Sequence, residues 1–150
     1  MRAVIQRVKS ASVTVAGDLI SRIEDGLLVL LGVVELDGAE DIEWLAQKVA
    51  TMRIFTDENG GWNLNVQDTG GSVLVVSQFT LFASTKKGTK PSWHRAASAE
   101  TATQVLELFI KALSAHLPGK VESGEFGAMM DVALVNDGPV TLIVDTKARE

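Results

Sequence analysis

The chain has 150 residues, 46% of them hydrophobic and 22% charged, which is enough for one packed domain spanning residues 1–150. It contains no cysteine, which excludes disulfides, thiolate catalysis and cysteine-based zinc sites. The net charge of −5 argues against binding nucleic acid with the whole surface, although a local basic patch remains compatible with it. The first residues do not form a signal peptide, and no apolar run reaches the roughly 20 residues that span a bilayer. We therefore expect a cytoplasmic protein with no membrane partner.

The N-terminal third of the chain has the pattern of β-strands. Alternation over residues 4–8 and β-branched residues at 12–15 predict extended structure. Ala16–Gly17–Asp18 predicts a hairpin turn into a strand over Leu19–Ile23. The continuous apolar run Leu27–Val34 predicts a strand buried on both faces.

The middle of the chain alternates between helix and strand. A helix over Ala39–Arg53 is predicted from apolar residues at helical spacing, which are Ile42, Leu45, Ala46, Val49 and Met52. A turn at 57–61 and a short strand at 62–66 follow. The segment Val73–Leu81 is the strongest candidate for a central strand.

The C-terminal half begins with a polar loop at 83–97. Ser98 is a suitable N-cap for a second helix, which ends near Leu117 before Pro118. Three further strands are predicted, at 120–124, 130–136 and 140–145. This order of elements indicates a single α/β layered domain with mixed and antiparallel sheets and two main helices.

Polar residues follow directly on the buried strand that starts at Val73. In an extended strand, Ser77, Phe79 and Leu81 would face one way and Gln78 and Thr80 the other. Polar groups at the end of a central strand need hydrogen-bond partners or a cavity. The segment is therefore either a strand that leaves the core or the wall of a site.

Asn136–Asp137–Gly138–Pro139 lies between two apolar segments and predicts a turn. Pro139 is less ordinary there, because it fixes φ and removes a backbone donor at the start of the next strand. The sequence leaves the cis or trans state of the Gly138–Pro139 bond open.

A basic loop contains no acidic residue, since Asp and Glu are absent between Thr69 and Ala99. Its cations are Lys86, Lys87, Lys90 and Arg95. Together with Trp93, they form either a solvated loop or a phosphate-contacting patch with an aromatic ring that stacks on a base.

Familiar catalytic patterns are missing from the sequence. There is no nucleophile elbow, P-loop or dinucleotide-binding fingerprint. His94 and His116 are the only histidines, and neither follows a metal-ligand spacing. We expect no metal and no cofactor.

Two segments resemble the signature motifs of the D-aminoacyl-tRNA deacylase family. They are Ser77-Gln78-Phe79-Thr80-Leu81 and Asn136-Asp137-Gly138-Pro139-Val140-Thr141. The resemblance extends over nearly the whole chain, through segments at 5–8, 11–13, 63–66, 87–92 and 124–130. Lys90 and Met129 depart from the pattern, where an arginine and an acidic residue are expected.

The resemblance implies a homodimer with active sites at the subunit interface. Catalytic residues Ser77, Gln78, Phe79 and Thr80 of one subunit would form the floor of the site. Gly138 and Pro139 of the other subunit would enter it as a cis peptide that rejects L-aminoacyl-tRNA. Arg7 and Asn136 would support this motif, and Met130 would line the pocket. The implied partner is the aminoacylated 3′ end of tRNA, and we expect no DNA partner.

Two mechanisms are compatible with these residues. The Thr80 hydroxyl could attack the ester, but it needs a base, and the sequence offers none. Alternatively, backbone N–H groups around Phe79 and Thr80 stabilise the oxyanion while water attacks, helped by the 2′-hydroxyl of the substrate; we favour this hypothesis. Competing functions are an RNA-binding module without activity, a small-molecule esterase or amidase that uses Thr80, and a purely structural dimer.

Overall fold

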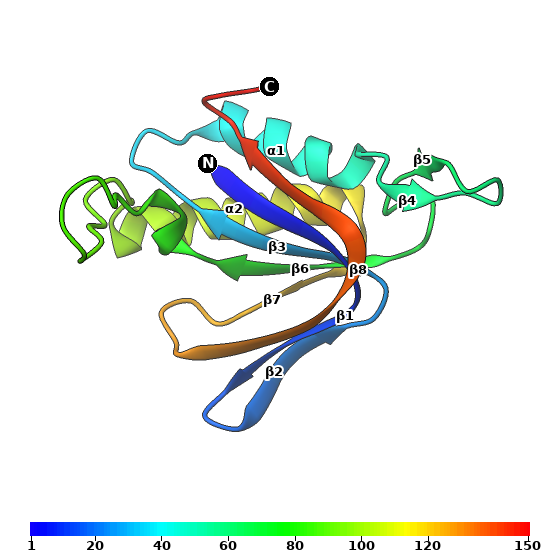
Figure 1. Cartoon of the computed structure of the whole chain (residues 1–150), viewed down its shortest axis with the longest axis horizontal. Helices are drawn as coiled ribbons and strands as arrows, with labels where there is room; N and C mark the ends of the chain where they lie inside the picture. The colour runs from blue at the N-terminus through cyan, green and yellow to red at the C-terminus, as the bar shows by residue number, and fades with distance from the viewer.

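The computed structural model describes all residues, 1–150, as one six-stranded mixed sheet with two helices and a small hairpin (Figure 1). The strands are β1 (Arg2–Val15), β2 (Asp18–Ile23), β3 (Gly26–Gly32), β4 (Phe55–Thr56), β5 (Trp62–Leu64), β6 (Ser72–Ser77), β7 (Val121–Ser123) and β8 (Met130–Asp145). The helices are α1 (Ala39–Thr51), a short 3-10 turn η1 (Phe79–Phe82) and α2 (Ala99–His116). No helix is long and apolar enough to cross a membrane.

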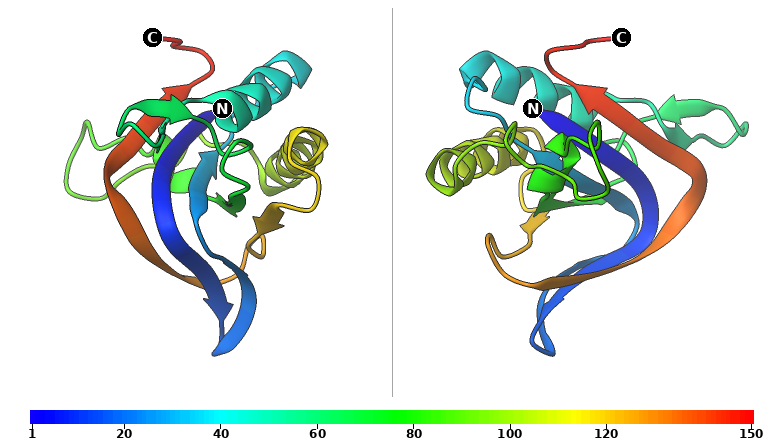
Figure 2. Two further views of the ribbon diagram at one scale, coloured as in Figure 1. Left: turned by 90° about the vertical axis from the view of Figure 1, so that its right-hand side faces the viewer. Right: turned by 60° about the vertical axis from the view of Figure 1, so that its left-hand side comes forward.

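The sheet has the order β2-β1-β3-β6-β7, and β8 pairs with β1. β3–β6 and β6–β7 are parallel pairs, whereas β1 pairs antiparallel with β2, β3 and β8. β1 and β8 are long and strongly bent, and they run side by side along the molecule (Figure 2). The predicted α/β layered domain with mixed and antiparallel pairing is confirmed.

The core fills both faces of the central strands. Val73 and Val75 of β6 pack in the larger cluster with residues of α1 and α2, such as Leu45 and Phe109. Leu74 and Val76 point to the other face, into a smaller cluster between the bent strands. β3 shares this two-sided burial, as its apolar run predicts.

The second helix begins where the sequence predicts it. The Ser98 side chain accepts a hydrogen bond from the Thr101 N–H and so caps α2. The first helix, α1, also occupies the predicted segment, and it ends at Thr51 with Met52 as its C-cap. Both predictions rest on helical spacing of apolar residues, which the packing of α1 against α2 confirms.

The predicted extent of the central strand is wrong, because β6 ends at Ser77 and not at Leu81. The Gln78 N–H bonds to the Leu31 carbonyl at 2.7 Å, and the chain then turns into η1. The turn crosses Gly32, where a Cβ atom would lie 3.1 Å from Leu81 Cβ. A glycine at this point therefore lets the turn pack on the sheet, and the predicted alternation of side chains from Ser77 onward does not occur.

The predicted turn at 136–139 is also wrong, because β8 continues through it as one strand. Pairing with β1 skips here: Val8 lies opposite Asn136, but Gln6 lies opposite Thr141. Residues 137–140 of β8 therefore lie opposite a single residue of β1, Arg7. The segment that contains Gly138 and Pro139 is therefore an extended bulge of β8 and not a hairpin turn.

Candidate active site

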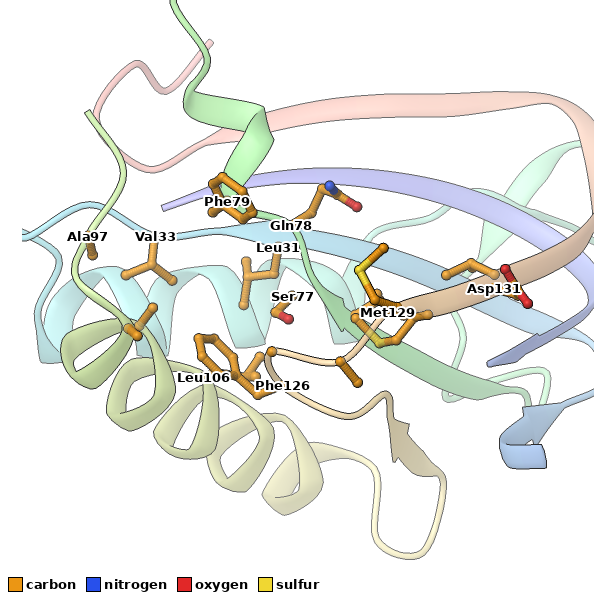
Figure 3. Close-up of a pocket in the computed structure, with 17 residues that line it drawn as sticks. Leu31, Val33, Ser77, Gln78, Phe79, Ala97, Leu106, Phe126, Met129 and Asp131 are labelled. Carbon is orange, nitrogen blue, oxygen red and sulfur yellow. The ribbon is translucent and has the colours of Figure 1, made fainter. Parts of the chain in front are cut away.

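A cavity of about 600 Å3 opens where β6 ends. It lies between the end of β6, the N-terminal half of α2 and the segment that leads into β8 (Figure 3). Of the predicted site residues, Ser77, Gln78, Phe79 and Met130 line it. The remaining walls are largely apolar and include Val33, Ala97, Ala99, Ala102, Leu106 and Phe126.

Two backbone donors lie at Phe79, which lines this cavity, and at Thr80, the next residue. Phe79 and Thr80 are the first residues of η1, and their N–H groups have no acceptor within that turn. The next N–H, that of Leu81, is already bonded to the Gln78 carbonyl at 3.2 Å. Two neighbouring N–H groups without an acceptor are the kind of donor pair that stabilises an oxyanion in ester hydrolysis.

Thr80 does not line the cavity but is tied to a residue that does. The side-chain amide of Gln78 donates a hydrogen bond to the Thr80 hydroxyl oxygen. An amide nitrogen that donates is no general base. Asp131 is the only ionisable residue in the cavity wall, and Figure 3 places it across the cavity from Phe79. The geometry therefore supplies no base for a Thr80 nucleophile.

The basic loop borders the same site. Lys86, Lys87, Lys90 and Arg95 are all exposed. Trp93 from this loop packs edge-on against Phe79, with ring centres 5.6 Å apart. Through Trp93, the loop therefore reaches the edge of the cavity, and its four cations are exposed to solvent.

The second predicted motif lies elsewhere in the chain, around the bulge of β8. Arg7 forms an ion pair with the Asp137 carboxylate at 2.8 Å and donates to the Ile54 carbonyl at 2.6 Å. Gln6 donates to the Asn136 side chain at 3.1 Å. The Gly138–Pro139 peptide is cis. Both residues are exposed, and neither lines the cavity beside Phe79.

Several residues around the two motifs were not found from the sequence. Trp62 stacks on the Arg7 guanidinium, with its ring centre 5.6 Å away, and Gln6 supports Asn136. Ala99, Ala102 and Leu106 line the cavity from α2. The only available signal was the spacing of small residues at the start of α2, which equally fits an ordinary helix contact.

A sequence model of a known family, described as D-Tyr-tRNA(Tyr) deacylase, matches residues 4–145. The chain belongs to this family. The predicted family, and with it the predicted class of enzyme, a D-aminoacyl-tRNA deacylase, is confirmed.

Relatives in this deacylase family match the chain along its whole length. A protein of Akkermansia muciniphila named D-aminoacyl-tRNA deacylase is 55% identical over 100% of both chains. One of Chloroflexus aurantiacus with the same name is 56% identical, over 97% of this chain and 91% of its own.

Solved structures share the fold. One titled c-Myc DNA Unwinding Element Binding Protein has a TM-score of 0.91 and 41% identity, covering 97% of this chain and 98% of its own. Another, titled as a probable eukaryotic D-amino acid tRNA deacylase, has a TM-score of 0.81 over 95% of this chain and 97% of its own. At 16% identity, the second supports the fold alone.

Proposed function

We propose that this protein hydrolyses the ester bond of D-aminoacyl-tRNA in the cytoplasm and releases the free D-amino acid and tRNA. The observation that carries the proposal is the pair of free backbone donors, Phe79 N–H and Thr80 N–H, at an apolar cavity without a base beside Thr80. Such donors stabilise the oxyanion of ester hydrolysis, and each contributes on the order of 3 kcal/mol in well-studied enzymes. Water is the nucleophile, assisted by the 2′-hydroxyl of the terminal ribose.

Rejection of L-aminoacyl-tRNA is assigned to Gly138 and Pro139 of a second subunit. The bulge of β8 presents both residues to solvent, away from the cavity of their own chain. Arg7, buried beneath the bulge, holds Asp137 and so fixes the shape of the motif. The Gly138 and Pro139 carbonyls of the partner would leave room for hydrogen at the substrate α-carbon but not for an L side chain.

An exposed apolar strand supports the homodimer. β8 pairs only with β1, so its other edge is free. Apolar side chains are exposed along it and just before it, including Met129 at 91%, Ile143 at 74% and Val135 at 54%. A long edge strand of this kind is an aggregation risk unless a partner covers it. We infer that a second copy docks on this edge with its bulge near the first copy's Phe79, which is itself 54% exposed.

The tRNA would be held at its 3′ end by the basic loop. Lys86, Lys87, Lys90 and Arg95 would contact phosphates, and the Phe79–Trp93 pair would offer a surface for a base. Binding of only the 3′ end of the tRNA by a local basic loop is compatible with the net charge of −5. Because glycine has no side chain, a steric filter would let glycyl-tRNA through, so mischarged glycyl-tRNA is a second proposed substrate.

The test is turnover of D-tyrosyl-tRNA by the purified protein, compared with D-tyrosine ethyl ester. Fast loss of the tRNA ester, with slow loss of the ethyl ester, supports the proposal. Efficient hydrolysis of both would instead identify a small-molecule esterase. Tight binding of D-tyrosyl-tRNA without turnover would identify a binding module and contradict the proposal.

A further inference from the structure

Arg2, at the start of β1, contacts η1 and β8 at the same time. Its Nη1 donates a hydrogen bond to the Leu81 carbonyl at 3.0 Å. Its Nε and Nη2 lie 2.9 and 2.8 Å from Oδ2 of Asp145, the last residue of β8. The guanidinium also lies over the Phe82 ring, 4.8 Å from its centre. One side chain thus connects the turn that carries the Phe79 and Thr80 donors to the strand that carries the Gly138–Pro139 bulge.

The backbone of η1 does not fix its own direction. Its turn is closed by the Leu81 N–H to the Gln78 carbonyl and by the Ala83 N–H to the Thr80 carbonyl, at 3.2 and 3.0 Å. Both bonds are local, so they set the shape of the turn but not its orientation relative to the sheet. The bond from the Gln78 N–H to the Leu31 carbonyl and the packing of Leu81 on Gly32 place the start of the turn on the sheet. The bond from Arg2 to the Leu81 carbonyl is the side-chain hydrogen bond that holds the body of the turn from outside.

Arg2 is itself firmly held. Arg2 and Asp145 lie directly opposite each other in the β1–β8 pairing, so the ion pair is anchored on two strands. The Arg2 side chain is only 30% exposed and that of Asp145 is 16% exposed. Burial raises the pKa of Asp145, but hydrogen bonds from the Lys147 N–H and from Arg2 outweigh it and hold that pKa below its usual value. The carboxylate therefore stays ionised as the anchor.

We propose that Arg2 is a positioning residue for ester hydrolysis, and that Asp145 holds it in place. This inference rests on the proposed function, because it concerns the direction of the Phe79 and Thr80 N–H groups. Arg2 does not touch the substrate; it orients η1 through Leu81 and Phe82. Small errors in the placement of oxyanion donors reduce catalysis strongly, since the donors must aim at charge that appears only in the transition state.

A second role for Arg2 would be direct contact with an RNA phosphate. Two observations argue against it. The charge of Arg2 is already balanced by Asp145, and each of its three nitrogens already contacts either Asp145 or the Leu81 carbonyl. A phosphate contact would affect KM and the salt dependence of binding, whereas positioning affects kcat.

The experiment compares three variants with a matched control. R2M removes the donors and the charge, R2K keeps the charge without the planar fork, and D145N removes the anchoring charge. The control is R22M, which breaks the Arg22–Glu24 pair, an exposed arginine–carboxylate contact at 2.9 Å at the end of β2. For each we would measure kcat and KM with D-tyrosyl-tRNA, together with the thermal midpoint and the salt dependence of KM.

We expect R2M to lower kcat by about 100-fold with KM within about twofold, because the substrate contacts remain while the donors are misdirected. R2K and D145N should fall between R2M and the wild type, and R22M should match the wild type. If R2M does not fold, R2K and D145N decide the question: a lowered kcat in both supports positioning, and wild-type kcat in both contradicts it. Unchanged kcat in folded R2M, or an effect on KM and salt dependence alone, would overturn the inference. An inactive wild-type protein would instead contradict the proposed function on which the inference about Arg2 rests.

Discussion

The Gln78 side-chain amide donates a hydrogen bond to the Thr80 hydroxyl oxygen at the end of β6. This contact occupies the hydroxyl without providing a base. The first prediction is therefore that Thr80→Ala keeps activity on D-tyrosyl-tRNA within about tenfold of the wild type, a change of roughly 1.4 kcal/mol in the barrier. Single-turnover kinetics measure this. A loss of activity beyond about 1000-fold with an unchanged thermal midpoint would indicate that Thr80 is the nucleophile.

A second prediction concerns the division of the site between subunits. A Cβ atom at Gly138 would meet only Asn136 Nδ2, at 3.5 Å, so Gly138→Ala should fold normally. It should nevertheless reduce activity, because the added methyl group would enter the partner's site. A heterodimer of Gly138→Ala with a Gln78→Ala subunit would retain one interface site free of both substitutions.

Mixing the two impaired homodimers should therefore raise activity above that of either homodimer alone if the motifs act across the interface. The matched control is a mixture in which one subunit carries both substitutions and the other carries neither. Failure of the first mixture to gain activity, with heterodimers confirmed by native mass spectrometry, would place both motifs in the same subunit's site.

A third prediction concerns the basic loop. Replacing Lys86, Lys87, Lys90 and Arg95 by glutamine should weaken tRNA binding and flatten its salt dependence by at most about 3 in log–log slope, at roughly 0.7 for each contact to a single strand. Exposed Lys111 and Lys120, replaced in the same way, are the control. Filter binding at several salt concentrations gives the slopes. Equal slopes for both variants and the wild type would show that the loop is only solvated.

A fourth prediction concerns acid stability at the start of α1. Burial raises the pKa of Asp41, but hydrogen bonds from Lys147, Thr146 and the Gly38 N–H, and the charge of Lys147, outweigh it and lower the pKa to about 2. A carboxylate whose pKa is lower in the folded protein than in the unfolded chain stabilises the fold at pH values above the unfolded pKa. This stabilisation is lost as pH falls from about 4 to about 2. A shift from 3.8 to about 2 corresponds to roughly 2 kcal/mol.

Asp41→Asn should therefore lower the free energy of unfolding at pH 7 by up to that amount. The difference from the wild type should shrink as pH falls through that window. Urea unfolding at pH 7 and pH 3 measures it, with Asp18→Asn on the exposed hairpin as the control. A difference between Asp41→Asn and the wild type that is equal at both pH values would contradict the assignment.

The sequence predicted the structure best where buried apolar residues recur at the regular spacing of a helix or a strand. α1, α2 and the two-sided burial of β3 follow from apolar spacing, and the cap at Ser98 follows from its side chain. The end of β6 could not be predicted in the same way. Its turn depends on Gly32 of another strand, which is distant in sequence and leaves room for Leu81.

The site depends even more on distant contacts. The Asn136–Pro139 segment has the composition of a hairpin turn, but β1 pairs with β8 on both sides of it and makes it a bulge. Arg7 and Asp137 meet only in that pairing. The motifs themselves came from resemblance to a family, whereas the roles of Arg2 and Asp145 depend on geometry that no local pattern encodes.

The most direct test of the central claim is hydrolysis of D-tyrosyl-tRNA and L-tyrosyl-tRNA at equal enzyme concentration. Our account predicts rapid loss of the D ester while the L ester remains intact. Hydrolysis of both esters would support the oxyanion site at Phe79 and Thr80 but contradict the proposed role of Gly138 and Pro139 in rejecting the L ester. Hydrolysis of neither, by a folded dimer, would contradict the proposed function itself.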